Sequence, residues 1–152
     1  MWRSCGSASL ARLTRSTPRD DTWDISGDGW NGAFHFVTSD WNQGAIHNHV
    51  GRRDDVDHGW SAVVFLSPKP DPRRGTTFWR SRATGKCYSL ESVYDSRFSQ
   101  YELVLDLENV YNRAVFFFGS VLHRAGRGFG KSLTDSRMLQ AFFFNVERNT
   151  AA

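Results

Sequence analysis

Hydrophobic and polar positions form short runs along this chain, and turn residues separate the runs. Aromatic and β-branched residues bounded by Gly, Pro, Asn or Asp are typical of β-strands. The pattern predicts strands over residues 33–37, 45–50, 60–66, 75–80, 114–118, 121–123 and 137–146. Residues 101–107 fit either a strand or a helix, and the polar stretch 81–100 holds at most a short helix near 90–98.

The breaks between the runs limit how the strands connect. Pro68, Pro70 and Pro72 end the third strand, because proline lacks the N–H group that a sheet ladder requires. Short strands with Gly- and Pro-containing turns and no long periodic helix predict an all-β fold with minor α content, a sandwich or jelly roll. The sequence shows no internal repeat and no dividing linker, so we expect one domain over residues 23–148.

Residues 1–22 differ from the rest of the chain. Arginines alternate there with Ser and Thr, and no acidic residue precedes Asp20. Such a start occurs in mitochondrial transit peptides, but its poor helical amphipathicity favours a flexible N-terminal extension. Cys5 and Cys87 give neither a disulfide framework nor a Cys-rich zinc pattern, which favours a reducing, cytoplasmic setting.

The composition supports a folded domain with a substantial core. Of the 152 residues, 39% are hydrophobic, including 12 Phe, 6 Trp and 4 Tyr. No apolar run reaches the roughly 20 residues of a membrane helix. The net charge of +3 is modest and the arginines are scattered. We therefore expect neither a membrane nor a nucleic-acid partner.

Three histidines are the main candidate ligands. His47 and His49 are two residues apart in a predicted strand, so their side chains point to one face. His123 follows an apolar run and can bring a third imidazole from another strand. Imidazole suits iron, zinc, copper and nickel as a ligand. Alternatively, each of the three is a core histidine with a hydrogen-bond partner. Burying two imidazoles on one face without partners costs several kcal/mol, so the pair His47 and His49 favours a metal site more than a single histidine would.

Other polar residues allow two interpretations each. Arg137 opens the last strand, and it either grips a carboxylate inside the fold or faces water at the sheet rim. Arg113 has the same two possibilities, and a surface position is favoured. We expect a structural role for His35 and a solvated position for His58 in the charged loop 51–59.

The order of these motifs resembles that of the iron(II)/2-oxoglutarate-dependent oxygenase superfamily, closest to its prolyl-hydroxylase-like and uncharacterised bacterial branches. The matching segments are residues 46–49, 60–66, 75–78, 112–123 and 136–144. The resemblance covers residues 30–146 and implies a double-stranded β-helix, or jelly roll, of cupin-like architecture. Five motifs in the family's order are more specific together than any one alone.

The resemblance also implies roles for single residues. His47 and His123 become ligands of Fe(II), and Arg137 becomes the partner of the C5 carboxylate of the cosubstrate 2-oxoglutarate. The family pattern is His-x-Asp…His, and His49 stands here at the carboxylate position. Either His49 completes a three-histidine site or a carboxylate from the following loop completes it. That loop offers Asp54, Asp55 and Asp57.

The activity that the resemblance implies is hydroxylation of a small-molecule or peptide substrate, with no catalytic residue beyond the metal ligands. Two alternatives stay open. One is a catalytically degenerate oxygenase or a non-enzymatic jelly-roll module that binds a ligand. The other is a cupin-like enzyme that uses three histidines without 2-oxoglutarate. The loop 51–59 and the segment 81–100 are expected to flank the mouth of the site.

Overall fold

The described part of the chain folds into two antiparallel β-sheets. A computed structural model describes residues 32–41, 43–50 and 59–144. Within these ranges the regular elements are strands and two 3-10 helices, and no helix is long and apolar enough to cross a membrane. The predicted all-β class is confirmed, whereas the described residues contain none of the expected minor α-helix.

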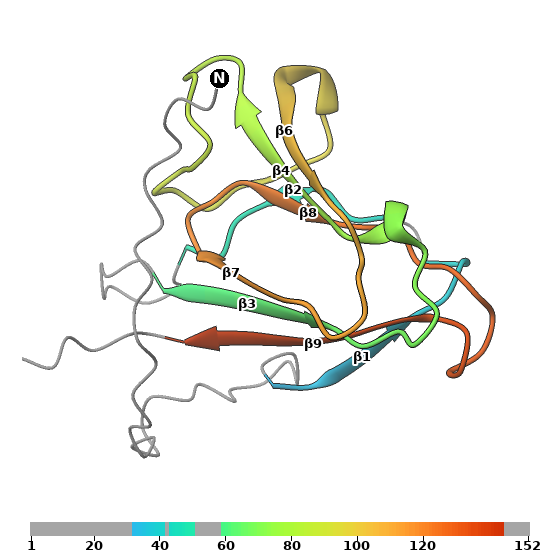
Figure 1. Ribbon diagram of the computed structural model, residues 1–152. Coiled ribbons are helices and arrows are strands. Elements are labelled where there is room, and N and C mark those ends of the chain that lie inside the picture. The colour runs from blue at the N-terminus through green and yellow to red at the C-terminus, as the bar shows by residue number, and fades with distance from the viewer. Residues whose placement is uncertain (1–31, 42, 51–58, 145–152) are drawn as a thin grey trace, which may run out of the picture.

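Four strands form the first sheet, in the order β1-β9-β3-β7. They are β1 (Phe34–Val37), β9 (Arg137–Phe144), β3 (Trp60–Phe65) and β7 (Ala114–Phe118). Each neighbouring pair is antiparallel, and this sheet occupies the lower half of Figure 1. The first and last strands of the chain therefore lie side by side.

Five strands form the second sheet, in the order β5-β2-β8-β4-β6. They are β5 (Tyr94–Asp95), β2 (Ile46–His47), β8 (His123–Ala125), β4 (Thr76–Ser81) and β6 (Tyr101–Leu107). The 3-10 helix η1 (Pro72–Arg74) precedes β4, and η2 (Phe98–Gln100) precedes β6. This sheet forms the upper layer in Figure 1, so the two sheets pack as a sandwich.

Most predicted strands are found, with two differences in the site region. The strand predicted over 45–50 is limited to Ile46–His47, because the side chain of the next residue, Asn48, donates hydrogen bonds to the carbonyl oxygens of Ser89 and Glu91. The short helix predicted near 90–98 is wrong: β5 lies there and η2 begins only at Phe98. Residues 101–107 form a strand, and residues 145–146 of the last predicted strand lie outside the described residues.

Side chains that point inward from both sheets form the core. Phe65, Ile46 and Leu122 are almost completely buried, and each such side chain contributes about 1.5–3 kcal/mol by leaving water. Phe117 of β7 contacts Phe78 of β4 edge to face, with ring centroids 5.2 Å apart. This contact joins the two sheets beside the histidines described next.

Candidate metal centre

Three histidines come together between the sheets. His47 of β2 lies directly opposite His123 of β8, and opposed residues of an antiparallel pair share one face. His49, two residues beyond His47, adds its ring to the same group. The ring centroids are 4.4 Å apart for His47 and His123, 4.8 Å for His49 and His123, and 5.0 Å for His47 and His49. The predicted convergence of these three side chains is thus observed.

Backbone carbonyls fix which nitrogen of two rings is available. The Nδ1 atom of His47 lies 3.1 Å from the carbonyl oxygen of Ala45, and that of His123 lies 2.8 Å from the carbonyl oxygen of Val121. A carbonyl only accepts hydrogen bonds, so both Nδ1 atoms carry the proton and both Nε2 atoms carry a lone pair. Histidines that ligate metals are commonly oriented by such a bond from the second nitrogen.

The spacing of the ring nitrogens fits a shared cation. One ligand atom from each histidine can be chosen so that all three lie within 4.8 Å of one another, and His49 Nε2 lies 3.0 Å from His123 Nε2. Two nitrogens bound to one ion at about 2.1 Å and at right angles would also be about 3.0 Å apart. Without an ion, this contact requires one proton shared between the two nitrogens.

Two neighbours hold His49, which lies beyond the end of β2. Its N–H group donates to the carbonyl oxygen of Gly119 at 2.6 Å. A Cβ atom on Gly119 would lie 2.6 Å from the His49 carbonyl oxygen, so this approach requires glycine. The adjacent Asn48 donates through Nδ2 to the carbonyl oxygens of Ser89 and Glu91, and its Oδ1 accepts from the Val93 N–H group.

Burial keeps the cluster neutral. Desolvation, reinforced by the neighbouring histidines, lowers the pKa of His123 well below its usual value. Desolvation, with a smaller contribution from His47, lowers the pKa of His49 to about 4, and desolvation also lowers the pKa of His47. All three imidazoles are therefore neutral at pH 7, each with one N–H group and one lone pair, which is the state that binds metal ions.

Aromatic rings line the cluster on its inner side. The rings of Phe117 and Phe143 lie 4.6 Å from those of His123 and His49, respectively. On the other side, β5 pairs with β2 so that the exposed Tyr94 lies opposite His47, with ring centroids 6.2 Å apart. The cluster thus has apolar walls toward the first sheet and a border with solvent near β5.

Arg137 is buried, with 2% of its surface exposed. Its guanidinium reaches from β9 to the η1 turn, where Nε donates to the carbonyl oxygen of Arg74 at 2.7 Å and Nη2 to that of Gly75 at 3.0 Å. No ion pair joins Arg137 to a carboxylate among the described residues. Burial lowers the pKa of Arg137 to about 10, so it remains a cation at pH 7. The inward of its two predicted orientations is the one observed.

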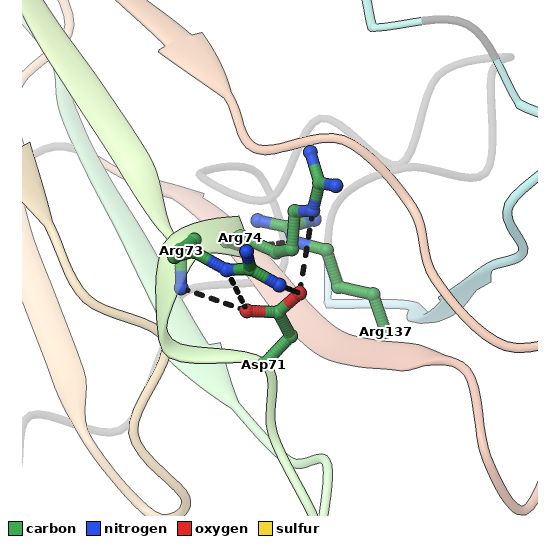
Figure 2. A network of polar contacts seen from close by, with 4 residues as sticks. All are labelled: Asp71, Arg73, Arg74 and Arg137. Carbon is green, nitrogen blue, oxygen red and sulfur yellow. Dashed lines mark hydrogen bonds and ion pairs between the residues drawn. The ribbon is translucent and has the colours of Figure 1, made fainter.

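The nearby acid is engaged elsewhere, as Figure 2 shows. Asp71 caps η1 and pairs with Arg73, whose Nε lies 3.1 Å from Asp71 Oδ1. Its other oxygen lies 3.5 Å from Arg74 Nε. The guanidinium groups of Arg73 and Arg74 therefore share this single carboxylate, whereas Arg137 contacts the same turn only through backbone carbonyls.

The remaining candidates lie apart from the cluster. His35 of β1 pairs with Leu139 and is not in the three-histidine group, and the partly exposed Arg113 donates to the Glu108 carbonyl oxygen. The possible carboxylate ligands and the loop histidine lie outside the described residues: Asp54, Asp55, Asp57 and His58. Sequence reasoning missed the supporting roles of Asn48 and Gly119, and the only local signal is that Asn48 stands between two histidines.

The chain matches no family model, and no curated protein or solved structure is significantly similar to it. Evidence on function therefore comes from the geometry of the described residues.

Proposed function

We propose that this protein is a non-haem iron(II)- and 2-oxoglutarate-dependent oxygenase that hydroxylates a small-molecule or peptide substrate. His47, His49 and His123 would hold the metal ion. The observation that carries this proposal is the convergence of three neutral imidazoles, two of which have Nδ1 bonded to backbone carbonyls, so that Nε2 is the nitrogen left to bind a metal ion.

The donor set fits a catalytic metal better than a structural one. Structural zinc sites are closed by four protein ligands, whereas catalytic sites keep positions open for other ligands. The described residues supply three ligands, all imidazole, which suits iron and its later neighbours in the transition series. The chemistry that bound Fe(II) and 2-oxoglutarate would supply is oxidation of a substrate C–H bond, as the resemblance implies.

The strand order supports a jelly roll. One sheet contains β1, β9, β3 and β7, and the other contains β2, β8, β4 and β6 with the short β5 at its edge. Strands from the two ends of the chain thus pair in both sheets, as expected for eight strands rolled into two facing sheets. This arrangement brings His47 and His123 onto neighbouring strands although they are far apart in the sequence.

Arg137 supports the proposal that 2-oxoglutarate is the cosubstrate. A buried cation that forms no ion pair within the described part of the chain is costly, and a carboxylate ligand would relieve that cost. Its two backbone contacts leave three N–H groups of the guanidinium for such a ligand.

The position of this cation suits a five-carbon dicarboxylate. Gly75, which Arg137 contacts, directly precedes β4 and lies three residues before Phe78, the pairing partner of His123; in extended chain this separation is about 10 Å. An extended five-carbon chain spans about 5 Å, and the contacts at its two ends bring the reach to about 10 Å. Arg137 would orient this molecule, and the walls formed by Phe117 and Phe143 would exclude water.

A second candidate is a metal-binding jelly-roll module without oxygenase activity. The observation that favours it is His49, because a neutral imidazole replaces the anionic ligand of the family pattern. A three-histidine enzyme that does not use 2-oxoglutarate is related to this candidate and differs in the role of Arg137.

Anaerobic titration with Fe(II) and then 2-oxoglutarate separates these functions. We expect one iron per chain, a visible charge-transfer band when 2-oxoglutarate is added, and succinate formation when oxygen is admitted. His47→Ala should lose the iron, and His35→Ala, outside the cluster, should keep it. Bound iron without the band or succinate would favour the second candidate. Failure of the wild type to bind any divalent transition metal would overturn both.

A further inference from the structure

The outer side of the four-stranded sheet carries a row of aromatic side chains on each flank. Phe117 and Phe143 point inward to the histidines, so their neighbours along β7 and β9 point outward. Strand pairing extends this outward face across the sheet to β1 and β3. We call it the aromatic face and define it by Phe34, Phe36, Trp60, Phe116, Phe118 and Phe144.

Much of this face is in contact with water. The exposed fractions are 71% for Phe34, 58% for Phe36, 50% for Phe116 and 46% for Phe118. At about 200 Å² for each phenylalanine, these four side chains alone leave roughly 450 Å² of aromatic surface exposed. Trp60 and Phe144, which pair with each other at one end of the two central strands, add partly exposed surface to the same patch.

The face also lacks charge. At every position that the strand pairings place on this side, the side chain is apolar except for Gln140. Exposed sheets of monomeric proteins are usually protected by charged side chains, particularly on edge strands. Here the two edge strands, β1 and β7, carry the most exposed phenylalanines instead.

We propose that a second copy of this chain covers the aromatic face, forming a two-fold symmetric dimer. A two-fold axis places the same patch on both sides of the interface, and an uncharged patch meets its own copy without electrostatic repulsion. Two copies of the four phenylalanines would bury roughly 900 Å², and the partly exposed surface of Trp60 and Phe144 brings the total past the ~1,000 Å² of a specific interface.

The proposal goes beyond the proposed function and does not depend on it. The histidine cluster lies between the sheets, whereas the aromatic face lies on the outer side of one sheet. Dimer formation would therefore leave the border of the cluster near Tyr94 accessible. Metal binding and dimer formation can be tested separately.

Sedimentation velocity of the 152-residue chain over a wide concentration range tests the proposal. We expect the wild type to have twice the monomer mass, and Phe116→Asp to have the monomer mass with a wild-type circular dichroism spectrum. Leu103→Asp is the matched control, because Leu103 is 48% exposed on β6 of the other sheet. It should remain dimeric.

Phe34→Asp provides a second variant, since it changes the most exposed ring of the face, on an edge strand, with the least effect on folding. A monomeric wild type would overturn the proposal, as would both variants remaining dimeric. If the monomeric wild type instead sediments with phosphatidylcholine vesicles, the face binds lipid and the dimer is rejected. A monomer without vesicle binding would mean that other residues of the same chain cover the face.

Discussion

Acidification is expected to destabilise the metal-free protein through the histidine cluster. Burial lowers the pKa values of His47, His49 and His123 in the folded state, whereas in the unfolded chain they return to about 6.5. Below pH 6.5 the unfolded chain therefore binds more protons than the folded one. The free energy of unfolding must fall as the pH falls through this range.

The size of the effect follows from the size of the shifts. The pKa of His49 is lowered from 6.5 to about 4, and each unit corresponds to about 1.4 kcal/mol. His49 alone should therefore remove about 3 kcal/mol of stability between pH 6.5 and about 4. His47 and His123 act in the same direction and add to this loss.

The aspartates whose pKa values are shifted do not contribute to the loss of stability between pH 6.5 and about 4. Hydrogen bonds from Arg97 lower the pKa of Asp95 to about 2, so its stabilising contribution is complete above its ordinary pKa and is lost only as the pH falls toward about 2. The Arg73 contacts lower the pKa of Asp71 in the same direction. Destabilisation that begins near pH 6.5 therefore results from the protonation of histidines.

Urea unfolding with a chelator present, at a series of pH values from neutrality to about pH 4, measures the effect. His49→Gln should reduce the acid-induced loss by about 3 kcal/mol, because the titrating group is removed. An unfolding free energy that stays level down to about pH 4 would refute the argument, and so would an equal loss in His49→Gln.

Three other substitutions test the supports of the site. Asn48→Ala removes three hydrogen bonds to the 89–93 segment and should cost about 1–3 kcal/mol in urea unfolding and about 10–100-fold in metal affinity by competitive titration. Gly119→Ala places a methyl group against the His49 carbonyl and should cost about 1–3 kcal/mol or more. Gly85→Ala, at a position of positive φ with no atom within 4 Å, strains the backbone away from the site and is its control for metal affinity. Arg137→Met should abolish the thermal shift given by 2-oxoglutarate while metal affinity stays at the wild-type level. An unchanged thermal shift would contradict the role of Arg137.

Local pattern in the sequence was enough to predict the histidine cluster. The two-residue period of extended chain places His47 and His49 on one side, and the apolar run before His123 indicates another buried strand. Both signals involve only neighbouring residues, so they do not depend on how the sheets assemble. The all-β class follows for the same reason.

Features set by strand pairing could not be predicted. The face to which Arg137 points depends on the register of β9 against β1 and β3, and that register is not a local property. The same holds for Gly119, whose small size matters only because the His49 backbone lies against it. The strand after Ala45 ends early because Asn48 bonds to the 89–93 segment, more than forty residues later in the chain.

The separation of His47 and His123 along the chain gives a bound ion a mechanical role. Joining them through one ion would close a loop of roughly 75 residues, and a covalent cross-link of that span would stabilise a fold by about 4 kcal/mol through loss of unfolded-state entropy. The ion would act as a reversible cross-link between distant parts of the chain. Its removal would then weaken the whole sandwich as well as the site itself.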